Sequence, residues 1–130
     1  MEGLIVKPKW CSKILNDGKC LEVRGSQTSK INIPLYLLES GTRRVRGTFM
    51  ISKCIPATKE NWESLKPLHQ VDISWEELLK IYKKPYFWQL NDVKIWDDVS
   101  YYEHPQGAVI WVKNVSLIDE MQDERIRYEY

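Results

Sequence analysis

Three ionisable side chains of opposite sign stand close together near the start of the chain, at Lys19, Glu22 and Arg24. The segment around them alternates as a strand does, with Leu21 and Val23 on one face and the two charged residues Glu22 and Arg24 on the other. Burial of the apolar face would hold the acid–base pair out on the second face, on rigid backbone. An ordinary exposed ion pair is the alternative interpretation, and the residue types alone favour it.

The element before this strand is expected to be a short amphipathic helix. Pro8 suits its first turn, where the missing N–H costs nothing. An apolar stripe follows at helical spacing, and the polar run 16–18 closes the helix, with Gly18 free to adopt the left-handed conformation. The stripe consists of Trp10, Cys11, Ile14 and Leu15.

Lysines accompany one aromatic residue of this helix. Lys9 precedes Trp10, with further lysines at positions 7 and 13. Such a cluster could stack a base and bind a phosphate. Packing of Trp10 in the core stripe is the commoner outcome, and we prefer it about two to one.

The remaining pattern predicts several short strands around two helical inserts. A serine at position 74 and a glutamate at position 77 form the sequence of a capping box at the start of the second helix. Asp97 and Asp98 are read as a solvated turn rather than as a catalytic pair. The expected strands are 4–6, 31–38 with Pro34 at an edge or a bulge, 43–55, 86–90 and a buried final strand 108–112. The fold class is α+β, a small and partly open mixed β-barrel with flanking helices.

Composition narrows the class of protein. A chain of 130 residues with 28% charged and 43% hydrophobic residues is typical of one globular domain, 1–130. Three cysteines without a CxxC pair, and only two histidines, give little support to a disulfide framework, a metal site or a catalytic triad. The start of the chain lacks the features of a secretory signal, and no apolar run could span a membrane. We therefore expect an intracellular protein, in the cytoplasm or, in a eukaryote, also the nucleus.

Charge is distributed unevenly along the chain although the net charge is only +1. Residues 1–59 carry eleven Lys and Arg against four Asp and Glu, whereas residues 60–130 carry eight against fourteen. The densest basic group is Arg43, Arg44 and Arg46. Such a distribution could provide a basic surface for phosphates, or folding could interleave the two parts and cancel the field.

Three segments together resemble the ASCH domain family. The run 18–24 is similar to the family pattern G-x-K-x-x-E-x-R: Lys19, Glu22 and Arg24 match, whereas the expected glycine position holds Asp17. The aromatic run 86–93 and the run 102–111 are similar to the family's aromatic strand and to its closing turn and last strand. The resemblance spans most of residues 4–113, and residues 114–130 form a C-terminal extension outside it.

The resemblance implies a PUA-like pseudo-barrel that binds RNA, DNA or a nucleoside, without a cofactor. In the family the Lys-x-x-Glu-x-Arg residues line the ligand site, which nominates Lys19, Glu22 and Arg24, and, at the matched closing turn, Gln106. Lys9 and Trp10 join them as binding candidates from their own spacing. The first hypothesis is a nucleic-acid or modified-nucleobase binding module, with RNA favoured.

The second hypothesis is an enzyme. Some small members of the family deacylate N4-acylcytidine nucleosides, and others have been described as ribonucleases. In this chain Lys19, with its pKa lowered by desolvation, would act as the base or polarise the amide carbonyl, and Glu22 would relay a proton. The deacylating relatives carry a threonine nucleophile where this chain has Glu22, so a glutamate would have to activate water instead. A third interpretation gives Glu22 and Arg24 a purely structural role.

Overall fold

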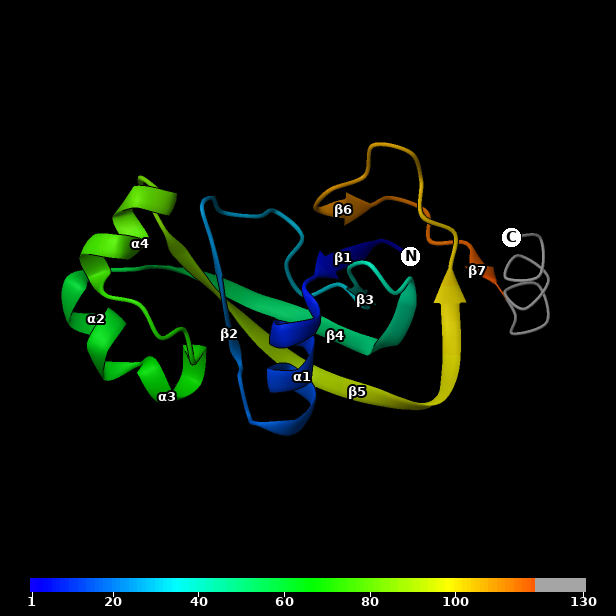
Figure 1. Ribbon diagram of the computed structural model, residues 1–130, viewed down its shortest axis with the longest axis horizontal. Coiled ribbons are helices and arrows are strands. Elements are labelled where there is room, and N and C mark those ends of the chain that lie inside the picture. Colours follow the sequence, from blue (N-terminus) through cyan, green and yellow to red (C-terminus); the bar gives the residue numbers. More distant parts are fainter. Residues whose placement is uncertain (119–130) are drawn as a thin grey trace. The chain divides into compact units, whose positions relative to one another are not determined.

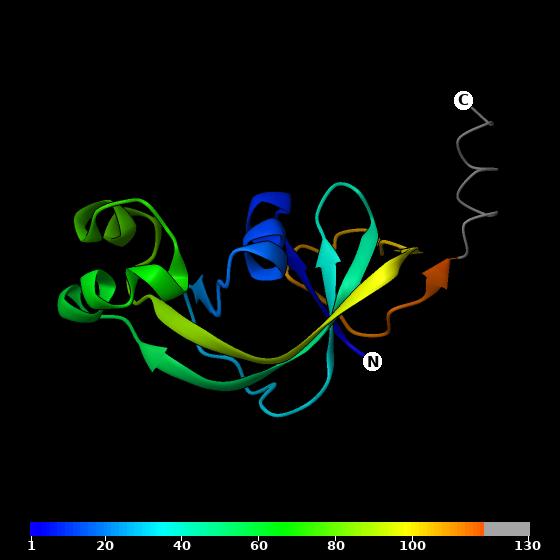
Figure 2. The same ribbon diagram turned by 90° about the horizontal axis from the view of Figure 1, so that it is seen from below.

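The computed structural model describes residues 1–118, and the chain divides into two compact units. Unit 1 comprises residues 1–11, 34–49 and the segment from Asp92 onward, and unit 2 comprises residues 12–33 and 50–91. The strands are hydrogen-bonded in the order β2-β5-β4-β3-β1-β6, with β7 beside β5 (Figures 1 and 2). The strands are β1 (Gly3–Val6), β2 (Leu21–Arg24), β3 (Leu35–Glu39), β4 (Arg44–Pro56), β5 (Tyr86–Tyr102), β6 (Trp111–Val112) and β7 (Leu117–Ile118), and the helices are α1 (Pro8–Asn16), α2 (Lys59–Ser64), α3 (Lys66–His69) and α4 (Trp75–Ile81).

Unit 1 is organised around the short, fully buried strand β1. It pairs in parallel with β3 and antiparallel with β6, and β3 continues into β4 through an antiparallel pairing. Alternation along β4 buries Val45 and Phe49 and leaves the residues between them half-buried, apart from Gly47. Gly47 is required by close packing, because a Cβ there would stand 2.0 Å from the carbonyl oxygen of Lys94. The core of the unit comprises Ile5, Leu38, Val45, Tyr102 and Val112.

Unit 2 packs its three short helices against the β2 and β5 strands. In the antiparallel register Leu21 lies opposite Gln89 and Arg24 opposite Tyr86. Leu21 and Phe87 form one core cluster with Trp62 of α2 and Leu78 of α4. Burial of these apolar groups supplies the main driving force for closing the helices onto the strands.

Helix boundaries in unit 2 follow the predicted capping chemistry. Ser74 accepts a hydrogen bond from the backbone N–H of Glu77 at 3.1 Å, and the Glu77 carboxylate accepts one from the N–H of Ser74, so the predicted capping box is confirmed. Pro67 lies in the first turn of α3, a position that needs no N–H donor. Residue 65 separates α2 from α3.

Several strand predictions need correction. The strand expected at 31–38 begins only at Leu35, because Pro34 stands before it and cannot donate to a ladder. Asp97 and Asp98 lie within the long strand β5 rather than in a turn, both exposed. The expected buried strand 108–112 is reduced to β6, and Val109 is 76% exposed. In each case the pairing with other strands, and not the residue types of the segment itself, decided where the strand begins and ends.

Within residues 1–118, no helix has the length and apolar character needed to cross a bilayer.

Candidate functional site

The site predicted from the sequence lies on β2 and the adjoining part of β5, in unit 2. Glu22 is opposite Trp88 and Arg24 is opposite Tyr86, and such directly paired residues project from the same face of a sheet. We call these four residues the Arg24 face. The other face of β2 carries Leu21 against the helices. Strand alternation was therefore predicted correctly.

Burial differs from the expectation. The predicted exposed pair is wrong for Glu22, whose side chain is 5% exposed, and Lys19 is completely enclosed. The Lys19 ammonium donates to the backbone carbonyl oxygen of Leu21 at 2.9 Å and to that of His69, and lies 3.7 Å from a Glu22 oxygen. A buried ammonium is tolerated when carbonyl and carboxylate oxygens replace water in this way.

The polar turn before β2 explains how Lys19 becomes buried. Gly18 has φ +77°, so the chain reverses after α1 in the left-handed conformation. The next residues attach to the end of α3: the N–H of Cys20 donates to the carbonyl of Leu68 at 3.0 Å, and the Gln70 side chain donates to the carbonyl of Asp17 at 2.7 Å. Lys19 thus places a cation at a helix C-terminus, where the unpaired carbonyls are electronegative.

Burial changes the acid–base behaviour of Lys19. Desolvation lowers the pKa of its ammonium group from 10.5 to about 8, and the neighbouring Glu22 carboxylate partly opposes this shift. The direction agrees with the sequence-based expectation for a catalytic lysine. The contacts of Lys19 do not favour catalysis, because its ammonium donates to two main-chain carbonyls and lies beside a carboxylate. The arrangement favours a positioning role.

A second buried group, His69, was not predicted from the sequence. Its ring stacks on Trp62 at 3.9 Å and lies 5.5 Å from Phe87, between centroids. Nδ1 accepts from the N–H of Val71 at 3.0 Å, so Nε2 carries the proton and donates to the carbonyl of Trp62 at 2.7 Å. Burial lowers the pKa of this imidazole, with the Lys19 charge adding to the effect. Nothing in the sequence around this isolated histidine indicates that its ring is buried and stacked.

Arg24 reaches solvent, unlike its neighbours Lys19 and Glu22; we call these three residues the triad. The Arg24 side chain is 18% exposed, and Nη2 donates to Glu22 Oε2 at 2.9 Å. The guanidinium lies 5.7 Å from the Trp88 ring centroid, within cation–π range. Glu22 therefore joins an enclosed lysine on one oxygen to a partly exposed arginine on the other.

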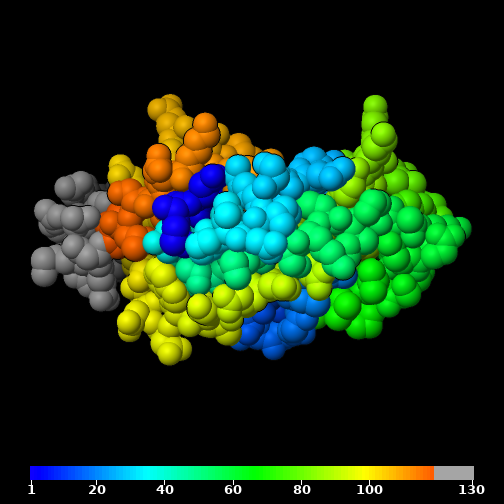
Figure 3. Space-filling model, turned by 180° about the vertical axis from the view of Figure 1, so that it is seen from behind, coloured from blue at the N-terminus to red at the C-terminus, as the bar shows by residue number. Residues whose placement is uncertain are grey.

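A polar loop, 25–30, follows directly after Arg24 and is largely exposed (light blue in Figure 3). The Trp88 indole donates to the carbonyl of Ser26 at 2.8 Å, and the Gln27 side chain donates to the Tyr86 hydroxyl at 3.4 Å. The N–H of Thr28 lies 3.5 Å from the Cys54 sulfur. These contacts hold the loop over the aromatic residues of β5.

The other candidates belong to unit 1. Trp10 is half-buried on α1 rather than part of the core, as the preferred interpretation had it, and the Lys9 ammonium lies 4.9 Å from its ring centroid. Gln106 is exposed in the turn before β6, beside Gly107 at φ +82°. Of the predicted site residues, the structure brings together Lys19, Glu22 and Arg24 in unit 2.

The three arginines at and just before the start of β4 (Arg43, Arg44 and Arg46) differ in their contacts. Arg46 donates to the buried Glu39 carboxylate at 2.9 Å, and Thr42 donates to the other oxygen of that carboxylate at 2.7 Å. Arg43 is exposed with φ +62°. One of the three arginines thus stabilises the β3–β4 turn rather than offering a free cation.

Across residues 1–118, His, Cys, Asp and Glu side chains do not gather in threes or more in a way that could hold a metal ion.

Comparison with known proteins shows the fold. No family model matches the sequence, and no curated protein matches it. The crystal structure of ASCH from Zymomonas mobilis is similar, with a TM-score of 0.57 at 12% identity over 99% of this chain and 80% of that one. A serine-to-alanine mutant of the same protein gives a TM-score of 0.60 at 9% identity, over 98% of this chain and 94% of that one.

A tyrosine-to-phenylalanine mutant of the Zymomonas mobilis protein is similar as well, with a TM-score of 0.56 at 12% identity over 99% and 82% of the two chains. At such identities the likeness defines the fold alone. The chain has the mixed α+β fold of the Zymomonas mobilis ASCH structures. The resemblance drawn from its sequence is thereby confirmed at the level of fold.

Proposed function

We propose that this chain is a nucleic-acid binding module, with RNA or a modified nucleobase as its ligand, and that Arg24 makes the contact. One observation carries the proposal: a partly exposed guanidinium is held rigidly between the Glu22 carboxylate and the Trp88 ring, beside Tyr86 and a polar loop. Guanidinium groups bind phosphate bidentately and stack on bases, and the half-buried Tyr86 ring extends the stacking surface, whereas the buried Trp88 ring supports the guanidinium from below.

The triad residues then have different roles. Arg24 contacts the ligand, whereas Lys19 and Glu22 are positioning residues. Glu22 fixes the guanidinium through Oε2, and Lys19 lies near the other oxygen while tying β2 to the end of α3. A preorganised cation loses little side-chain entropy on binding, which improves affinity without additional contacts. The likeness to ASCH domains supports the same class of ligand.

Equilibrium binding of labelled single-stranded RNA tests this proposal. Wild type, Arg24→Ala and Arg24→Lys are compared by fluorescence anisotropy, with Lys80→Ala as a control that removes one exposed positive charge from α4. We expect weaker binding for both Arg24 variants, and most of the loss to remain in Arg24→Lys because lysine cannot form the guanidinium's paired contacts. Equal binding by Arg24→Ala and Lys80→Ala would contradict the proposal.

Hydrolysis of an N4-acylcytidine-type nucleoside is the second candidate, and one observation favours it. The pKa of Lys19, about 8, is closer to neutral pH than that of an ordinary lysine. Incubation with N4-acetylcytidine decides between the candidates. Deacetylation by wild type that is lost in Lys19→Met, with the variant still folded, would establish the enzyme and overturn a binding-only function. No product after prolonged incubation would remove this candidate for that substrate.

A further inference from the structure

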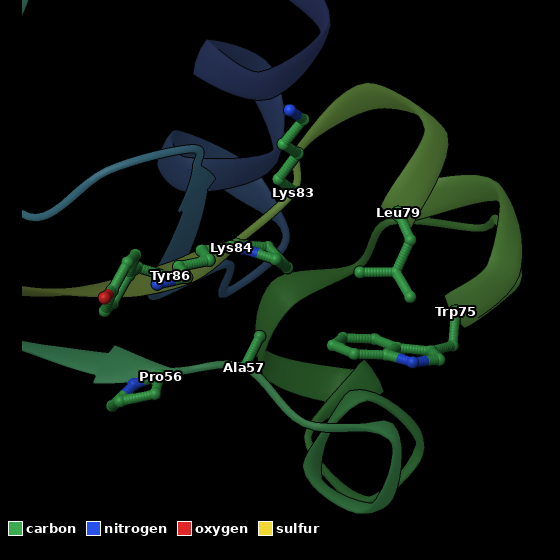
Figure 4. A pocket seen from close by; sticks show the side chains of 8 residues that line it. Pro56, Ala57, Trp75, Leu79, Lys83, Lys84 and Tyr86 are labelled. Atoms are coloured by element: carbon green, nitrogen blue, oxygen red, sulfur yellow. The ribbon is translucent and has the colours of Figure 1, made fainter.

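A hollow of about 220 Å³ lies in unit 2, outside the triad (Figure 4). Its walls come from the end of β4, the start of β5 and helix α4, and the N–H of Ala57 joins two of these walls by donating to the carbonyl of Pro85 at 3.0 Å. We call it the Trp75 hollow. It is lined by Pro56, Ala57, Trp75, Leu79, Lys83, Lys84, Pro85 and Tyr86.

Its chemistry combines flat apolar surface with two positive charges. Trp75 packs partly against the core of the unit and also lines the hollow, next to Leu79 one turn further along α4. Lys83 and Lys84 are exposed at the rim. The capping box at Ser74 fixes the start of α4 and so the place of Trp75. Drug-sized ligands occupy pockets of about 300–1,000 Å³, so this hollow suits a single planar ring with its charged group outside.

The hollow adjoins the Arg24 face through two direct links. Tyr86 belongs to both, because it pairs with Arg24 across the strands and also lines the hollow. Gly25, the residue after Arg24, packs against Tyr82, the residue before Lys83. A Cβ at Gly25 would stand 2.5 Å from the Tyr82 ring, so only glycine allows this approach. Tyr86 and the Gly25–Tyr82 contact therefore connect the hollow with the strand that carries Arg24.

We propose that the Trp75 hollow is a second nucleotide subsite. The ligand would then be a single-stranded nucleic acid longer than a dinucleotide. A base stacks on Trp75, Lys83 and Lys84 bind the adjacent phosphates, and the strand continues past Tyr86 to Arg24. Charge complementarity selects this occupant: lysine ammonium groups attract phosphates, and an aromatic face accepts any base. The inference rests on the proposed function of the Arg24 face.

Ligand length separates the two subsites in an experiment. Binding of a dinucleotide and of an RNA of about 10 nucleotides is measured for wild type, the double variant Lys83→Ala/Lys84→Ala, and a control of equal charge loss, Lys66→Ala/Lys80→Ala. For the longer RNA we expect the double variant to lower the salt slope of log Kd by about 1.4, since each phosphate contact contributes about 0.7. Dinucleotide binding at Arg24 should stay close to that of the control.

Trp75→Leu tests stacking, because leucine keeps the apolar packing and removes the aromatic face. We expect about tenfold weaker binding of the longer RNA and little change for the dinucleotide. Its free energy of unfolding is measured alongside, and the lysine double variant tests the subsite without touching the core.

The outcomes distinguish this inference from the proposed function. Wild type that binds neither RNA refutes both. Binding that depends on Arg24, with Lys83→Ala/Lys84→Ala equal to its control for the longer RNA, refutes the second subsite alone. A polyglutamate peptide that binds wild type and not the lysine double variant, while RNA binding is unaffected, would assign the hollow to an acidic protein partner and overturn the inference.

Discussion

The ammonium group of Lys19 donates a hydrogen bond to the main-chain carbonyl of His69, fifty residues later in the chain. The contact ties the start of β2 to the end of α3, and the same ammonium lies near Glu22, whose second oxygen holds Arg24. The buried lysine therefore sets the position of the one triad residue that reaches solvent. In the proposed function, a motif that looks catalytic in the sequence supports a binding residue.

Glu22→Gln should destabilise the fold. The glutamine keeps the shape of the side chain and removes the Glu22 carboxylate beside Lys19, so a buried ammonium loses this counter-charge. Breaking a buried ion pair from one side costs about 3–5 kcal/mol, and we expect about 3 kcal/mol because Arg24 remains partly hydrated. Urea unfolding measures the loss.

Glu76→Gln is the matched control for that change. Glu76 pairs with Lys59 at 3.8 Å with both side chains largely exposed, so its loss should change the free energy of unfolding by less than about 1 kcal/mol. If Glu22→Gln and Glu76→Gln were equally mild, the carboxylate of Glu22 would not be the support described here.

Stability at alkaline pH should report the lowered pKa of Lys19. Between about pH 8 and 10.5 the unfolded chain holds the Lys19 proton and the folded protein releases it, so the free energy of unfolding rises with pH. The rise amounts to about 1.4 kcal/mol per pH unit within this window. Urea unfolding of wild type and Lys19→Met from pH 7 to 9.5 isolates the contribution, since other groups titrate in both proteins. A difference that stays constant over this range would show that Lys19 has an ordinary pKa.

Stability in mild acid should depend on His69. Burial holds the pKa of this imidazole below 6.5, so below that pH the unfolded chain gains a proton that the folded protein does not. Wild type should lose stability as the pH falls from 7.5 to 5.5, and its advantage over His69→Gln should shrink over the same range. His104 is present in both proteins and cancels. An advantage that grows toward acid would mean that the folded protein stabilises the charged imidazole.

The sequence alone predicted the local elements that depend on near neighbours. The buried strand β1, the helix from Pro8 to the turn before Gly18, and the capping box at Ser74 all follow from periodicity and backbone chemistry. The alternation of Leu21 and Glu22 across β2 was also predicted correctly. These features need no knowledge of distant contacts.

Features that depend on contacts between distant segments could not be predicted from the sequence. Lys19 is enclosed because the end of α3 packs against it, and the sequence near residue 19 does not indicate this contact. His69 owes its tautomer to Val71 and Trp62. The segment that follows α4 comes near the end of β2 through the contact of Gly25 with Tyr82. The prediction of a buried strand at 108–112 was wrong for the same reason, because Val109 and Ile110 are exposed in the folded chain.

The salt dependence of RNA binding tests the central claim most directly. Log Kd of wild type and Arg24→Ala is measured against log salt concentration, with Lys80→Ala as the control for charge. If Arg24 contacts a phosphate of the single strand, its slope should exceed that of Arg24→Ala by about 0.7, while Lys80→Ala matches wild type. Slopes that coincide for wild type and Arg24→Ala would contradict the account.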